Sequence, residues 1–146
     1  MLDNLRSALM KYRKYRHPDL ADLALSDLYA LFPEEGEPLA TMHWDQQWPN
    51  SDHAGVYLIF DKNGKLLYVG KAWALGHRLA SYFQYRQPRG EGNACEIVHA
   101  WTPPGPMYIA TVAVPDDSKF EAASLEEYLI NELKPSENVR RMPDHC

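Results

Sequence analysis

The residue with the clearest chemical implication in this sequence is Glu126. Residues 121–133 have the pattern of a helix, and at about 100° per residue Glu126 falls within roughly 60° of five apolar residues. These neighbours are Ala122, Ala123, Leu129, Ile130 and Leu133. Because an unpaired buried carboxylate costs several kcal/mol, we expect Glu126 to meet a cation. That cation is either a basic side chain, in a structural ion pair, or a metal ion.

Two short runs rich in β-branched and aromatic residues are the next informative feature. Residues 55–60 and 65–70 flank Asn63-Gly64. An Asn-Gly pair between such runs predicts an antiparallel hairpin with a type I′ turn, since that turn needs positive φ at both central residues. The sequence therefore predicts a two-stranded unit in this region.

The register of this hairpin decides how its two tyrosines lie. With Asn63-Gly64 as a two-residue loop, Tyr57 pairs with Gly70 and Ile59 with Tyr68. With a four-residue loop, Tyr57 pairs with Tyr68. Side chains alternate along a strand, so both registers place the two phenols on one face. An odd-length loop or a bulge would separate them.

A third helix is predicted directly after the hairpin, over Trp73 to Phe83. Arg78 precedes Tyr82 by four residues, so both lie on the same side of this helix. A guanidinium is therefore expected close to the tyrosines if the helix packs on their face of the sheet.

The C-terminal half contains further elements. We expect residues 84–106, rich in Gly and Pro, to form a loop with a short helical turn around Glu96–Ala100. Met107 to Val114 alternates as a strand does. The sequence Ser118-Lys-Phe-Glu121 has the form of a capping box, which predicts a helix from there to about Leu133.

The N-terminal third differs in character. Residues 2–16 and 20–32 have helical patterns, separated by His17-Pro18. We interpret residues 33–54, with three prolines and no basic residue, as an acidic connector. The run Lys11-Tyr-Arg-Lys-Tyr-Arg16 alternates bases with aromatics, which indicates either a phosphate-binding surface or a solvated helix face with packed tyrosines.

Composition excludes several classes of protein. Of the 146 residues, 45% are hydrophobic and 24% charged, which is typical of a globular chain and not of a disordered one. The apolar runs are too short for a membrane span, so we expect no membrane partner. The N-terminus lacks the features of a signal peptide, and Cys95 and Cys146 have no ligand-like spacing. We therefore expect a reduced, cytoplasmic protein.

The net charge of −5 conceals strongly uneven segments. Residues 1–19 have a net charge of +3 and residues 61–90 of +5, whereas residues 20–60 have −7 and residues 91–146 have −6. A local basic region attracts a polyanion even in an acidic protein, so DNA remains a plausible partner.

These residues together resemble the GIY-YIG nuclease family. The resemblance rests on Gly55-Val-Tyr57, Tyr68-Val-Gly70, Lys71, Arg78, Tyr82, Leu125-Glu126, Leu129-Ile130, Lys134-Pro135 and Asn138, in this order and with matching gaps. Within the family the spacing is most similar to the N-terminal nuclease domain of the UvrC branch, the bacterial excision-repair incision nucleases. Each short motif is weak alone, whereas the ordered set is specific.

The resemblance implies an α+β fold, in which a small sheet of three antiparallel strands is flanked by helices. It covers residues 54–139. Residues 1–53 would then be a helical N-terminal extension with an acidic connector, and residues 140–146 a C-terminal tail.

The resemblance also implies roles for individual residues. Glu126 would be the metal ligand, with Mg²⁺ or Mn²⁺ as the cofactor, and Arg78 would contact the scissile phosphate. Tyr57 and Tyr68 would position or deprotonate the attacking water. The remaining members of the implied site are Lys71 and Tyr82 as assisting residues and Gly55, Gly70 and Asn138 as structural ones.

Elementary chemistry agrees with these residue types. Mg²⁺ commonly binds only one or two protein carboxylates and keeps several waters, so a single glutamate suffices. Arginine stays charged and binds phosphate bidentately. A phenol with a pKa near ~10 is a poor base at neutral pH, and Tyr57 or Tyr68 would need a nearby cation to lower its pKa.

Two functions follow as expectations. The first is a metal-dependent DNA endonuclease, for which repair, restriction and mobile-element roles all occur in the family. The alternative is a catalytically silent module of the same fold that binds nucleic acid or protein. The acidic segment 20–60 mildly favours the alternative, because it would repel DNA or bind a protein partner through the N-terminal extension.

Overall fold

The protein is described by a computed structural model that covers residues 2–31, 48–86, 94–97 and 101–138. Its elements are α1 (Asp3–Arg13), β1 (Ala24–Leu25), β2 (Tyr29–Ala30), β3 (Gly55–Asp61), β4 (Leu66–Ala72), α2 (Leu75–Tyr82), β5 (Phe83–Arg86), β6 (Ala94–Ile97), β7 (Pro106–Ala113), a 3₁₀ turn (Asp116–Ser118) and α3 (Glu121–Leu133). The mixture of helices with antiparallel strands confirms the α+β class.

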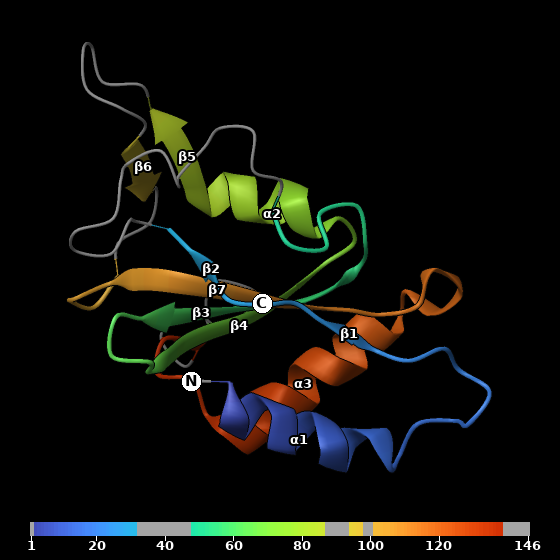
Figure 1. The fold of residues 1–146 in the computed structure, drawn as a ribbon. Helices are drawn as coiled ribbons and strands as arrows, with labels where there is room; N and C mark the ends of the chain where they lie inside the picture. Colours follow the sequence, from blue (N-terminus) through green and yellow to red (C-terminus); the bar gives the residue numbers. More distant parts are fainter. Residues whose placement is uncertain (1, 32–47, 87–93, 98–100, 139–146) are drawn as a thin grey trace.

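The fold is a sheet with helices on both faces (Figure 1). The strands follow the order β1-β7-β3-β4, with β2 also paired to β7. Helices α1 and α3 cover one face, while α2 and the β5–β6 ribbon lie over the other. Along β3, Val56, Leu58 and Phe60 pack toward α1 and α3, whereas Tyr57 and Ile59 pack toward α2. Strand β3 is therefore buried throughout, and β4 forms an edge of the sheet.

The hairpin pairs in the register predicted for the shorter loop. Tyr57 lies opposite Gly70 and Ile59 opposite Tyr68. A register shift between Ile59 and Phe60 lies beyond the tyrosines and does not separate them. Both phenols face the same side of the sheet, as predicted.

The predicted type I′ turn is wrong, although its residues do form the turn. Gly64 has φ of 82°, but Asn63 is not in the positive-φ region. The Asp61 carboxylate Oδ1 accepts hydrogen bonds from the N–H groups of Asn63 and Lys65, at 2.8 and 2.9 Å. This local bonding by Asp61 stabilises a longer turn, in which only the glycine needs the left-handed region.

The predicted helix over residues 20–32 is wrong for its described part, residues 20–31. They contain the short strands β1 and β2, so the sheet has five strands instead of three. Between these strands the Ser26 N–H donates to the Thr111 carbonyl and the Thr111 N–H donates to Ser26 Oγ, both at 2.9 Å. Pairing with β1 and β2 satisfies the backbone groups along the outer edge of β7. If this segment were helical, those groups of β7 would stay unpaired, so strand pairing overrides the local helical preference.

Two smaller predictions also need correction or fall outside the described ranges. The helical turn around Glu96–Ala100 is wrong at Glu96 and Ile97, which belong to β6 and pair with β5. Residues 98–100 lie outside the described part of the chain, as do residue 32 of the predicted helix, residues 33–47 of the connector and the tail at 140–146.

Helix α3 spans the predicted residues, but the capping box at its start is absent. Ser118 belongs to the preceding 3₁₀ turn, where its N–H donates to the Pro115 carbonyl at 3.0 Å. Glu121, expected to bond back toward Ser118, instead pairs with Arg16 of the segment after α1, with Nε and Oε2 2.5 Å apart. The Glu121 carboxylate binds the charged Arg16 side chain instead of a backbone N–H at the helix start, because the charged hydrogen bond is the stronger one.

This ion pair holds α1 to α3. The side chains of Arg16 and Glu121 are only 7% and 8% exposed, and the Tyr12 hydroxyl also donates to Glu121, at 3.1 Å. Leu5 and Leu9 of α1 enter the same core as the apolar side of α3. The described part of the N-terminal extension is therefore packed into the body of the fold.

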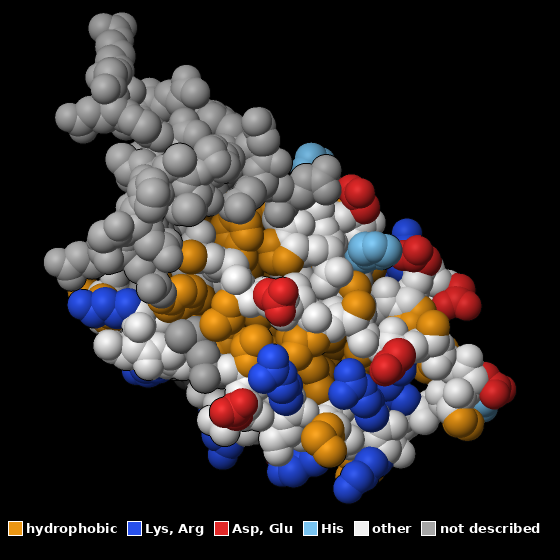
Figure 2. All heavy atoms as spheres, in the orientation of Figure 1, with side chains coloured by type: hydrophobic (Ala, Val, Ile, Leu, Met, Phe, Trp, Pro, Cys, Tyr) orange, Lys and Arg blue, Asp and Glu red, His pale blue; other side chains and the backbone are white. Residues whose placement is uncertain are grey.

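The basic run at residues 11–16 is largely used in intramolecular pairs. Lys11 bonds Glu132 at 2.8 Å and Arg13 bonds Asp22 at 3.2 Å, in addition to the pair made by Arg16. Figure 2 shows acidic and basic side chains interspersed on the molecular face in view. These contacts favour the helix-face interpretation over a phosphate-binding surface. None of the described helices has the length and apolar character needed to cross a bilayer.

We expect Arg16→Ala to lower the free energy of unfolding by at least about 2 kcal/mol, because it leaves the Glu121 carboxylate buried without its partner. Arg13→Ala is the matched control, since its pair with Asp22 is exposed and worth less than ~1 kcal/mol. Urea denaturation at neutral pH measures both. Equal losses in the two variants would contradict the structural importance of the buried pair.

Candidate active site

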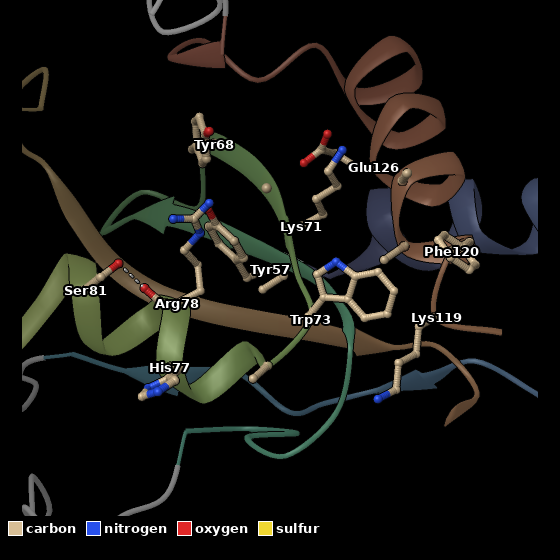
Figure 3. Close-up of a pocket in the computed structure, with 15 residues that line it drawn as sticks. Tyr57, Tyr68, Lys71, Trp73, His77, Arg78, Ser81, Lys119, Phe120 and Glu126 are labelled. Atoms are coloured by element: carbon tan, nitrogen blue, oxygen red, sulfur yellow. Dashed lines mark hydrogen bonds between the residues drawn. The ribbon is translucent and has the colours of Figure 1, made fainter. Parts of the chain in front are cut away.

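A cavity of about 860 Å³ opens at the edge strand β4, between α2 and the start of α3 (Figure 3). Its lining comes from β3, β4, α2, α3 and the residues that follow β4 and precede α3. It consists of Tyr57, Tyr68, Gly70, Lys71, Ala72, Trp73, Ala74, His77, Arg78, Ser81, Lys119, Phe120, Ala122, Ala123 and Glu126. The helices that contribute to it cover opposite faces of the sheet. They can face one cavity because the sheet ends at β4.

Tyr57 reaches this cavity from the inner strand β3 because its cross-strand neighbour is Gly70. A Cβ on Gly70 would collide with the outer atoms of the Tyr57 ring, Cζ and Oη. The missing side chain leaves room for the phenol to extend across the edge strand. This is a packing reason for glycine at position 70.

Gly55 has a similar reason at the other motif. A Cβ on Gly55 would collide with the Val112 carbonyl oxygen of β7. Glycine therefore allows β3 and β7 to approach each other at the start of the motif.

Three tyrosines form a cluster at the inner wall of the site. The ring of Tyr57 lies 6.0 Å from that of Tyr68 and 5.7 Å from that of Tyr82, between centroids. The Tyr57 hydroxyl donates a hydrogen bond to the Tyr82 hydroxyl at 3.1 Å. Trp101 packs edge-on against Tyr68, with centroids 6.1 Å apart. Tyr82 does not itself line the cavity, but it contacts Tyr57, which does.

The environment of Tyr57 disfavours its ionisation. Burial raises the pKa of the Tyr57 phenol far above its ordinary value, and the proximity of Tyr82 and Tyr68 raises it further, while Arg78 lowers it. The burial effect exceeds the effect of the guanidinium. At neutral pH Tyr57 is therefore a protonated hydrogen-bond donor.

The cations of the cavity are exposed side chains. Arg78 extends from α2 on one side, and Lys71 from β4. Two backbone N–H groups at the start of α2, those of Leu75 and Gly76, are already used, because they donate to the carbonyls of His53 and Ser51 at 3.0 and 2.9 Å. Anion binding here thus depends on side chains, not on these helix N–H groups.

Glu126 faces the cavity from α3, opposite Arg78 (Figure 3). The buried residues of α3 are Ala122, Leu125 and Leu129, whereas Glu126 is half-buried at the margin of this apolar side. It is the one acidic residue among those that line the described cavity. No group of three or more His, Cys, Asp or Glu side chains suited to a metal occurs in the described ranges.

Asn138 contributes through the backbone of β4. Its Oδ1 accepts the Val69 N–H at 2.9 Å and its Nδ2 donates to the Val69 carbonyl at 2.8 Å. Val69 lies between Tyr68 and Gly70, so this buried amide fixes the strand segment that holds both. Asn138 thus holds the backbone of β4 beside the site.

The structure brings together every residue expected at the site: Tyr57, Tyr68, Gly70, Lys71, Arg78 and Glu126 line the cavity, and Tyr82, Gly55 and Asn138 support it. Sequence reasoning missed the lining residues Trp73, His77, Ser81, Lys119 and Phe120, and the supporting Trp101. Trp73 follows the second glycine motif by only three residues, which was the one available signal for it.

The contact between Tyr57 and position 70 can be tested by a double-mutant cycle. We expect Gly70→Ala to lower the free energy of unfolding by about 1–3 kcal/mol, because the new methyl group overpacks against the phenol. In a Tyr57→Leu background, which lacks the outer ring atoms, the same substitution should cost clearly less. Urea denaturation of the four proteins gives the coupling. Additive losses would contradict the proposed clash.

Comparison with known proteins gives one consistent family. The model of the UvrC-like GIY-YIG domain matches residues 53–139. The chain is similar to UvrABC system protein C of Nautilia profundicola, with 36% identity over 88 residues, covering 60% of this chain and 14% of that protein. For the same protein of Moorella thermoacetica the identity is 37% over 94 residues (64% and 14%), and for that of Aliarcobacter butzleri 38% over 108 residues (64% and 15%).

The chain therefore spans about one seventh of the length of these relatives. The family match itself covers more than half of this chain. On that ground, and as its tyrosine and glycine motifs had indicated, the protein belongs to the UvrC-like GIY-YIG domain family.

Proposed function

We propose that this protein is a metal-dependent endonuclease that hydrolyses phosphodiester bonds of DNA and acts in DNA repair. One observation supports this proposal above all: a carboxylate, a guanidinium and two phenols from four separate elements line one open cavity. Family membership supports the same activity. The chain has these groups although its overall charge is acidic.

The residues present fit a single divalent metal at Glu126. Glu126 is half-buried and faces the cavity, whose other charged lining residues are basic. Mg²⁺ or Mn²⁺ is satisfied by one protein carboxylate when phosphate and water oxygens complete its shell. When bound, the metal would supply charge neutralisation at the phosphate and a water with a lowered pKa. Glu126 would hold it.

The protein's own side chains would do the remaining work. Arg78 and Lys71 would bind the scissile phosphate and stabilise the charge that develops as water attacks phosphorus in line with the leaving oxygen. Tyr57, whose hydroxyl proton is donated to Tyr82, would accept a hydrogen bond from the attacking water at its phenol oxygen and so orient it. The raised pKa of Tyr57 opposes a role as the base that accepts the water proton, so we assign Tyr57 a positioning role.

The cellular setting follows from this activity. The similarity to UvrABC system protein C and the proposed DNA substrate support a cytoplasmic repair role. We also propose a protein partner for the N-terminal extension, since Met10 and Tyr15 are 65% and 79% exposed there.

We expect the purified protein to nick supercoiled or branched DNA only when Mg²⁺ or Mn²⁺ is present, and Glu126→Gln to abolish nicking, because the amide is a poor metal ligand. Glu127→Gln, an exposed neighbour on α3, is the matched control and should keep full activity. Gel electrophoresis with and without a chelator measures both. Cleavage that survives Glu126→Gln would overturn the metal assignment. A wild-type protein that cuts no DNA would favour the silent binding module.

Arg78→Ala should lower the single-turnover rate by at least ~10²-fold, as expected for loss of a charge-stabilising donor. Arg78→Lys should restore part of this rate, because it keeps the charge but not the bidentate geometry. Arg6→Ala, on the exposed side of α1, serves as a control for net charge and should change the rate less than twofold. A similar small effect of Arg78→Ala would remove Arg78 from the site.

A further inference from the structure

Two large aromatic side chains lie exposed at the cavity. Trp73 is 60% exposed and Phe120 is 82% exposed, and their rings meet edge to face with centroids 5.4 Å apart. Trp73 follows β4 and Phe120 precedes α3, so the contact joins two separate elements beside the site (Figure 3). Both residues line the cavity that contains Arg78 and Glu126.

The core does not account for this pair. Neither ring belongs to the buried clusters on the two faces of the sheet. Both rings are largely exposed to solvent, so they bury little apolar area and contribute little to the stability of the fold. Exposed aromatics that gather beside a polar site are typical of binding surfaces.

The charges around the pair indicate what would bind. Lys119 Nζ lies 5.9 Å from the centre of the Trp73 ring, and Lys71 and Arg78 line the same cavity. Cations beside exposed aromatics match a nucleotide, which offers both a phosphate and a flat base. An apolar protein segment would match the rings but not these three cations.

We propose that Trp73 and Phe120 form a stacking platform for an unpaired nucleobase next to the scissile phosphate, with Lys119 contacting a flanking phosphate. This proposal rests on the proposed nuclease function and narrows its substrate. In a fully paired duplex both faces of each base are covered by its neighbours, so only an unstacked base can lie on a side-chain ring. The protein therefore prefers DNA that contains unpaired nucleotides at the cut over perfectly paired duplex.

The test uses the full chain and two labelled duplexes of the same sequence, one fully paired and one with a short central bubble. Fluorescence anisotropy in the presence of a chelator measures binding without cleavage. We expect tighter binding to the bubble, and we expect Trp73→Ala and Phe120→Ala each to weaken bubble binding by about tenfold, within the range measured for base–aromatic stacking. Binding to the paired duplex should change less than twofold.

Two further variants serve as controls. Phe120→Tyr keeps an aromatic face and should retain bubble binding. Tyr15→Ala removes an equally exposed aromatic from the segment after α1 and should change neither affinity. Urea denaturation confirms that the variants remain folded.

The outcomes separate this proposal from the proposed function. The stacking platform would be overturned if the two alanine variants lost affinity equally for both duplexes, or if they lost no affinity for the bubble. The second result would favour an apolar protein segment as the ligand of the two rings. Single-turnover cleavage with Mg²⁺ is measured in parallel. Intact cleavage by Trp73→Ala and Phe120→Ala with unchanged bubble affinity would reject the platform alone. Selective loss of bubble binding in a protein that cuts nothing would reject the nuclease and support the platform.

Discussion

The close contact between Tyr57 and Gly70 is the constraint on which the rest of the site depends. Cross-strand pairing places these residues opposite each other, and the absent side chain at position 70 allows a phenol from an inner strand to reach the edge of the sheet. Helices on opposite faces then border the same opening, so Arg78 of α2 and Glu126 of α3 face it together. A register shift of one residue would turn Tyr57 to the other face and dissolve this arrangement.

The parts of the fold that local sequence patterns determine could be predicted from the sequence. The β3–β4 register, strand β7 and helix α3 follow from alternation, turn residues and helical spacing. Apart from the turn at Asp61, which local hydrogen bonds decide, the main failures involve partners distant in sequence. Strands β1 and β2 form because β7 offers an unpaired edge, and the expected cap at Ser118 is lost because Arg16, more than a hundred positions from Glu121, binds that carboxylate. A single sequence does not show such competition.

The site was predictable to a different degree. Motif spacing identified its polar members, and the placement of Glu126 on a mostly apolar helix side was an independent sign. The structure refines that sign, since Glu126 lies at the margin of the core and not within it. The exposed rings of Trp73 and Phe120 were missed, because a single sequence does not distinguish an exposed hydrophobic residue from a core residue. The raised pKa of Tyr57 was equally hidden, since it depends on burial among other aromatic rings.

The segment after α3 has a consequence for association between molecules. Glu137 donates its N–H to the Leu67 carbonyl at 2.7 Å, and the Asn138 side chain occupies both backbone groups of Val69. Exposed sheet edges recruit foreign strands, and here the chain itself already fills the outer hydrogen bonds of β4 at Leu67 and Val69. Sheet growth by strand addition is thereby blocked along Leu67–Val69. The Asn138 amide thus shields the backbone groups of Val69 from strand addition, and Asn138→Ala would expose them.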